Sequence, residues 1–126
     1  MNKAIAVTGI VLLWIITLLL AFVFVAAGVK KFPDHGGWAH LFATWHFPIW
    51  FRYFIGVIEI AAGLLILWPR TATIAAVMIV IVMLGGMATH VWWGKPRETY
   101  HEAIPLALAS IVAVSRRRAS LIATPA

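Results

Sequence analysis

The sequence predicts an all-α membrane protein, built as a bundle of four transmembrane helices with a short interfacial helix in the first loop. Of the 126 residues, 63% are hydrophobic and only 11% are charged, which is too little charge to cover a soluble domain of this size. Apolar runs of about 20 residues, the length of a membrane-spanning helix, recur along the chain. No repeat or domain boundary interrupts this pattern, so we expect residues 1–126 to form a single membrane domain.

The first two helices are predicted over residues 4–29 and 49–68. The first run has no charged side chain and is longer than the apolar segment of about 7 to 15 residues in a signal peptide. We therefore expect it to be retained as a membrane helix. The second run carries only Arg52 and Glu59. Pro69 ends it, and the short turn that follows predicts an antiparallel hairpin with the next helix.

The third and fourth helices are predicted over residues 72–92 and 99–115. The third run contains no charged residue other than a protonated His90. The apolar part of the fourth run is short, but extending it back through residues 99–102 gives about the length that a span requires. Four helices are therefore preferred over three.

The first loop is predicted to contain a short helix over residues 37–46. Trp38, Leu41, Phe42 and Trp45 recur at the spacing i, i+3, i+4 and i+7, which places them on one face of a helix. A short helix with an aromatic face is typical of a segment that lies in the membrane interface. We expect it to cap the bundle.

The net charge of +6 and the absence of cysteine exclude several functional classes. Basic residues at helix ends indicate headgroup contacts and topology rather than nucleic-acid binding. A chain without cysteine has no disulfide, thiolate metal site or cysteine nucleophile. Four helices place both termini on one side, and the basic residues 116–118 predict that this side is cytoplasmic.

Glu59 is the most informative candidate residue, because it lies near the middle of a predicted membrane helix. An ionisable group there costs roughly 2.5 kcal/mol or more to insert, so it is expected to face protein or a water-filled cavity. Arg52, Gly56, Glu59 and Gly63 share one helix face, and glycine lets a neighbouring helix approach. Two roles remain open: a proton-handling or ligand-binding carboxyl, and a structural acid hydrogen-bonded to a neighbouring helix.

The other candidate ligand-binding residues gather at the ends of the helices on the loop side. Lys30 and Lys31 end the first helix, and adjacent positions differ by about 100° in direction. One lysine can therefore point inward while the other extends to the headgroups. We expect Lys30, His90, His101 and Glu102 to line a polar mouth above Glu59. The interfacial helix adds two aromatic residues over this mouth, Trp38 and Trp45.

A pocket with aromatic walls, an apolar shaft and a buried acid suits a quinone, whose ring stacks on aromatics and whose carbonyls accept hydrogen bonds. The same features suit an ordinary lipid or a partner's helix, and the three alternatives stay open. We expect no covalent cofactor. The histidine spacings match no metal-ligand signature, so we expect no metal site.

Three segments carry a family resemblance. The first segment, residues 27–32 (AGVKKF), lies at the end of the first helix. The second, residues 55–63 (IGVIEIAAG), lies within the second helix, and the third, residues 83–90 (MLGGMATH), lies at the end of the third helix. With the basic tail, they resemble the DoxX-like family of small four-helix membrane proteins over nearly the whole chain. The resemblance implies a bacterial inner-membrane protein associated with oxidoreductase complexes, and it places Lys30, Glu59 and His90 at motif positions.

We therefore expect an accessory or quinone-interacting subunit of a bacterial membrane redox complex. Without cysteine, any redox centre must be a bound small molecule or belong to a partner. The alternative is a non-enzymatic assembly or stabilising subunit that uses its small residues to pack against partner helices: Gly56, Gly63, Gly85 and Gly86. Expected partners are membrane lipids, other membrane subunits or further copies of the chain, and no nucleic acid.

Overall fold

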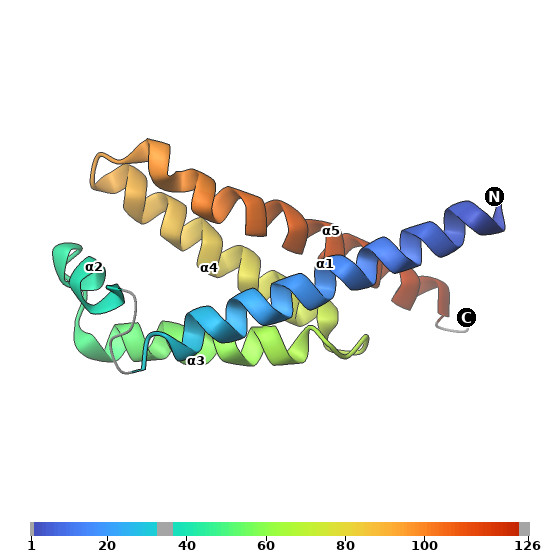
Figure 1. Cartoon of the computed structure of the whole chain (residues 1–126), viewed down its shortest axis with the longest axis horizontal. Helices are drawn as coiled ribbons and strands as arrows, with labels where there is room; N and C mark the ends of the chain where they lie inside the picture. The colour runs from blue at the N-terminus through green and yellow to red at the C-terminus, as the bar shows by residue number, and fades with distance from the viewer. Residues whose placement is uncertain (1, 33–36, 124–126) are drawn as a thin grey trace.

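The computed structural model describes residues 2–32 and 37–123, which form an all-helical structure (Figure 1). The short helix predicted in the first loop is present as α2, and a short 3₁₀ helix, η1, precedes the last helix. The elements in chain order are α1 (Lys3–Val29), α2 (Trp38–Thr44), α3 (Ile49–Leu65), α4 (Ala72–Trp92), η1 (Pro96–Thr99) and α5 (Tyr100–Ala123).

Two helix ends differ from the sequence-based bounds by three residues or more, and the other ends agree within two residues. α3 ends at Leu65 instead of residue 68, because the chain tightens into i→i+3 hydrogen bonds such as Leu67 N–H to the Leu64 carbonyl, 3.2 Å. α5 continues past residue 115 to Ala123. Arginine is a good helix former, and the Arg116 guanidinium lies 4.8 Å from the centre of the Trp14 ring, so the basic segment extends the helix beside α1.

Two helices, α1 and α4, are long and apolar enough to cross a membrane by length and composition. Many large apolar side chains on the helices are exposed, among them Phe22, Ile81 and Ile104 at 74%, 63% and 62%. So many exposed large apolar side chains are unusual on a soluble monomer and typical of a membrane-facing surface. The described residues are therefore those of an all-α protein with at least two candidate spans.

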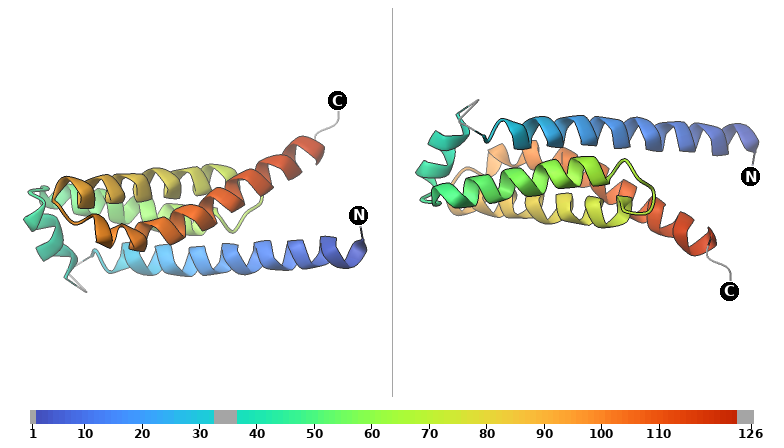
Figure 2. Two further views of the ribbon diagram at one scale, coloured as in Figure 1. Left: turned by 90° about the horizontal axis from the view of Figure 1, so that it is seen from above. Right: turned by 90° about the horizontal axis from the view of Figure 1, so that it is seen from below.

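The helices run side by side, with both termini at one end and α2 at the other (Figure 1). α1 packs along α3, and α4 packs along α5 (Figure 2). The buried core gathers toward the α3–α4 turn, where alanines let the backbones approach closely. Its buried members are Leu20, Ala21, Phe24, Ala62, Ile66, Ala72, Ala75, Ala76, Ile79, Ala109 and Val112.

Glycines determine how closely α1 approaches α3. A Cβ placed on Gly28 would lie 2.6 Å from the carbonyl oxygen of Gly56, and one on Gly63 would lie 3.0 Å from the carbonyl oxygen of Ala21. Neither position leaves room for a side chain without moving the backbone. Gly56 and Gly63 thus pack against α1 of the same chain.

Candidate functional site

The half of the bundle nearer α2 contains a cavity of about 550 Å³ to which all five α-helices contribute. One side is a cluster of aromatic rings, with Phe42 of α2 lying 5.6 Å from Trp45 and 6.3 Å from Phe51 between ring centres. Aliphatic side chains of α3 and α4, including Ile58 and Val82, form much of the remaining wall. The volume lies within the range typical of small-molecule sites.

An ion pair between Lys31 and Glu59 lies on the wall of this cavity. The Lys31 Nζ donates a hydrogen bond to Oε2 at 3.1 Å and lies at ion-pair distance, 2.9 Å, from Oε1. The two side chains are only 2% and 6% exposed. Charges removed from water this completely persist only when they are paired and hydrogen-bonded, so each group depends on the other.

Two further contacts hold the lysine in place. Its Nζ lies 3.4 Å from the carbonyl oxygen of Ala27 and 3.8 Å from the centre of the Trp38 ring. A cation over an indole face is attracted by the ring's quadrupole. α2 therefore covers the ion pair as well as the end of the bundle.

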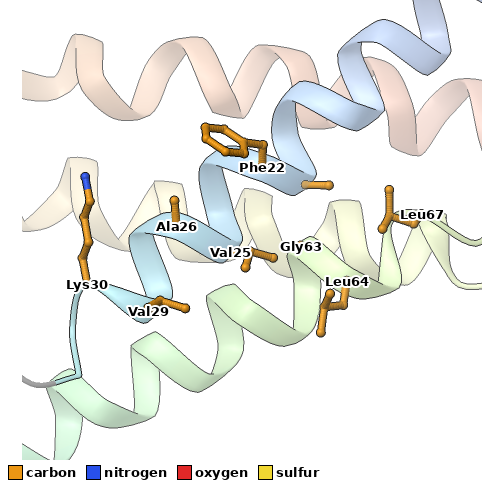
Figure 3. Close-up of a pocket in the computed structure, with 9 residues that line it drawn as sticks. Phe22, Val25, Ala26, Val29, Lys30, Gly63, Leu64 and Leu67 are labelled. Carbon is orange, nitrogen blue, oxygen red and sulfur yellow. The ribbon is translucent and has the colours of Figure 1, made fainter.

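The lysine that reaches Glu59 is Lys31, whereas the sequence-based expectation was Lys30. Lys30 is exposed and lies at the end of a shallow apolar groove between α1 and α3 (Figure 3). A signal for the correct choice exists in the sequence. Phe24, Gly28 and Lys31 lie at i, i+4 and i+7, so Lys31 belongs to the α1 face that packs on α3.

The direct contact with Glu59 is possible because α1 ends partway along α3 and not level with the first residue of α3. A Cβ on Gly56 would lie 3.3 Å from the Lys31 Cβ, which places the lysine backbone beside α3 less than one turn before Glu59. The lysine stem covers the remaining distance without an intervening water.

A second polar cluster joins α4, η1 and α5. The Nε2 of His90 lies 3.1 Å from Oε1 of Glu102, and its Nδ1 lies 3.5 Å from Oε2 of Glu98. The His90 side chain is 7% exposed, and its ring meets that of Trp45 edge-on at 5.2 Å between centres. Glu102 lines the cavity, whereas His90 does not. The carboxylate of Glu102 therefore lies between the His90 ring and the cavity.

The remaining sequence-predicted residues fall into three groups. Trp38, Trp45 and His101 line the cavity together with Glu59. Gly85 and Gly86 also lie on its wall, where Gly86 leaves room for Glu102, whose Cγ would be 3.0 Å from a Cβ at that position. Gly56 and Gly63 lie between α1 and α3. Sequence reasoning missed two residues as site members, Lys31 and Glu98.

The cavity can hold an amphipathic molecule through three kinds of contact. The aromatic cluster offers ring faces for stacking, the ammonium of Lys31 offers hydrogen-bond donors, and the carboxylates of Glu59 and Glu102 offer acceptors. No group of three or more His, Asp or Glu side chains within residues 2–32 and 37–123 is arranged to hold a metal ion.

Comparison with known proteins gives one match. The sequence model of the DoxX-like family matches residues 15–115, a range that includes both members of the buried ion pair and the whole His90 cluster. This match confirms the resemblance deduced from the three motif segments. No curated protein and no solved structure matches the chain.

Proposed function

Because the chain belongs to the DoxX-like family, we propose that it is a four-helix integral membrane subunit whose cavity binds a quinone for a membrane redox complex. Family membership and the two long apolar helices indicate a membrane protein. The observation that carries the ligand proposal is the buried Lys31–Glu59 pair on the wall of a cavity with an aromatic side. Intramembrane ionisable groups are costly and mark ligand or proton pathways.

In this proposal α3 and α5 cross the bilayer beside α1 and α4. Both termini then lie on the cytoplasmic side of the inner membrane, where the basic residues 116–118 meet anionic headgroups. α2 lies at the opposite interface and covers the cavity. Lipid surrounds the exposed apolar faces of the helices.

The quinone ring stacks on the aromatic cluster of α2 and the start of α3, and one carbonyl accepts a hydrogen bond from Lys31 Nζ. Reduction of a quinone to a quinol takes two electrons and two protons. The chain has no cysteine, so the electrons come from a redox group on a partner subunit. Glu59 and Glu102 are the carboxyl groups on the cavity wall that can hold the protons.

Filling the cavity tests the proposal. Gly85 lines the cavity, and nothing among the described residues lies within 4 Å of a Cβ there, so the side chain of Gly85→Leu starts in open space and takes up cavity volume. We expect at least a tenfold loss of affinity for a short-chain ubiquinone analogue, with the thermal stability of the protein retained. The measurement is saturable quenching of tryptophan fluorescence in lipid nanodiscs.

Gly9→Leu is the matched control. Gly9 lies on α1 outside the cavity, and a Cβ there also meets no described atom within 4 Å, so quinone affinity should stay within twofold of the wild-type value. If the wild-type protein shows no saturable quenching, or if Gly85→Leu binds as the wild type does, the cavity is not a quinone site.

A further inference from the structure

The His90 cluster connects the protein surface to the cavity. Glu98 of η1 is 46% exposed, His90 of α4 is 7% exposed, and Glu102 of α5 is 15% exposed and lines the cavity. One imidazole thus lies between a carboxylate that water reaches and a carboxylate that a cavity ligand reaches. From this arrangement we propose that Glu98, His90 and Glu102 form a proton path from the loop-side surface into the cavity.

Two buried atoms support this assignment over a purely structural one. His90 Nδ1 and Glu102 Oε2 are buried and find no hydrogen-bond partner among the described residues. The Nδ1 lies at ion-pair distance from Glu98 Oε2, 3.5 Å, but not in hydrogen-bond geometry. A cluster that served only to hold α4 against α5 would be expected to satisfy these atoms, because an unmet buried polar group costs about 1 to 3 kcal/mol.

The transfer uses both ring nitrogens. A proton from water joins the Glu98 carboxylate and passes to His90 Nδ1, giving an imidazolium. The imidazolium releases its Nε2 proton to Oε1 of Glu102, which becomes a carboxylic acid on the cavity wall while the imidazole returns to neutral. Glu102 then gives this proton to the ligand, and a half-turn of the imidazole turns the unprotonated nitrogen toward Glu98 and the N–H toward Glu102. Histidine suits this role because one ring nitrogen can accept a proton while the other donates one.

The surroundings keep the three groups aligned. The backbone N–H of Lys95 donates to the His90 carbonyl at 2.8 Å, which holds the start of η1 against the end of α4. The Trp45 ring lies against the imidazole. Among the described residues, the charged groups in contact with the imidazole are the two glutamates of the path.

The entry to the path can be tested without any ligand. In nanodiscs, ¹H–¹⁵N NMR measures the exchange of the His90 ring proton with water, with the signal assigned from a His90→Asn variant. Glu98→Gln has nearly the same shape and keeps a hydrogen-bonding group, but it cannot carry a proton. We expect it to slow this exchange at least tenfold, and we expect the conservative Glu98→Asp to restore a rate within threefold of wild type.

Exposed His40 provides the matched control, and His40→Gln should leave the His90 exchange rate unchanged. Because Glu98 is half exposed on a short surface helix, its variants should keep the fold. The path is overturned if exchange in Glu98→Gln stays within twofold of wild type, or if Glu98→Asp is as slow as Glu98→Gln.

Delivery to the cavity rests on the proposed function and has a separate readout. For nanodiscs on an electrode, cyclic voltammetry follows reduction of the bound ubiquinone analogue. We expect Glu98→Gln and Glu102→Gln each to lower the proton-coupled reduction rate at least tenfold. Glu98 does not line the cavity, so Glu98→Gln should change quinone affinity less than twofold. An unchanged rate would refute delivery through Glu102. Failure of the analogue to bind would refute the proposed function, and the NMR result would still decide whether protons enter through Glu98.

Discussion

Replacing either partner of the buried ion pair should strongly destabilise the protein, and replacing both should restore most of the loss. Lys31→Met leaves the Glu59 carboxylate without its counter-ion, and Glu59→Met leaves the ammonium with only a carbonyl and an indole face. Removal of one partner of a buried pair costs about 3 to 5 kcal/mol, whereas replacement of both by apolar residues of similar volume is often close to neutral. The unfolding free energy in detergent or nanodiscs, followed by circular dichroism, measures this cycle.

The double variant distinguishes pairing from independent roles. If the two groups stabilise each other, Lys31→Met/Glu59→Met should be at least 2 kcal/mol more stable than the sum of the single effects predicts. Simple additivity would show that the two charges do not depend on each other. The double variant also separates stability from function, since we expect it to remain folded and to bind the ubiquinone analogue at least tenfold more weakly than wild type.

Alanine at Gly28 should destabilise the protein by about 1 to 3 kcal/mol, the usual cost of overpacking. The added methyl group would lie 2.6 Å from the backbone oxygen of Gly56, so α1 and α3 must separate. Gly56→Ala should cost less, because its nearest obstacle is the Phe32 ring edge at 2.5 Å, which side-chain rotation can move. The measurement is again the unfolding free energy of each variant.

Gly85→Ala is the control for these substitutions. A Cβ at this position meets no described atom within 4 Å, and alanine favours helix over glycine by about 1 kcal/mol. We expect stability equal to or above that of wild type. If Gly28→Ala were as stable as Gly85→Ala, close packing of α1 on α3 through Gly28 would not hold. The packing of α1 on α3 also argues against part of the assembly alternative. Gly56 and Gly63 contact α1 and are therefore not free to contact a partner helix.

Much of the fold could be predicted from hydrophobic patterning. The apolar runs and Pro69 indicate the four long helices and the α3–α4 hairpin, and the aromatic spacing in the first loop indicates α2. These features depend on local composition and on helix periodicity, which neighbours along the chain largely determine. Helix ends were less predictable: α3 stops at Leu65 because its last turn tightens, and α5 extends through the basic segment where Arg116 meets Trp14.

The sequence by itself determined that Glu59 faces the inside of the bundle, since the cost of an ionisable group in lipid and its register with Gly56 and Gly63 leave no other face. Only the tertiary structure decided that Lys31 is its partner and that Glu98, His90 and Glu102 lie in a row. These contacts join residues from different helices, and they depend on where α1 ends along the length of α3 and on the path of η1. A helical repeat specifies the direction of a side chain, but only packing specifies which side chain on another helix it meets.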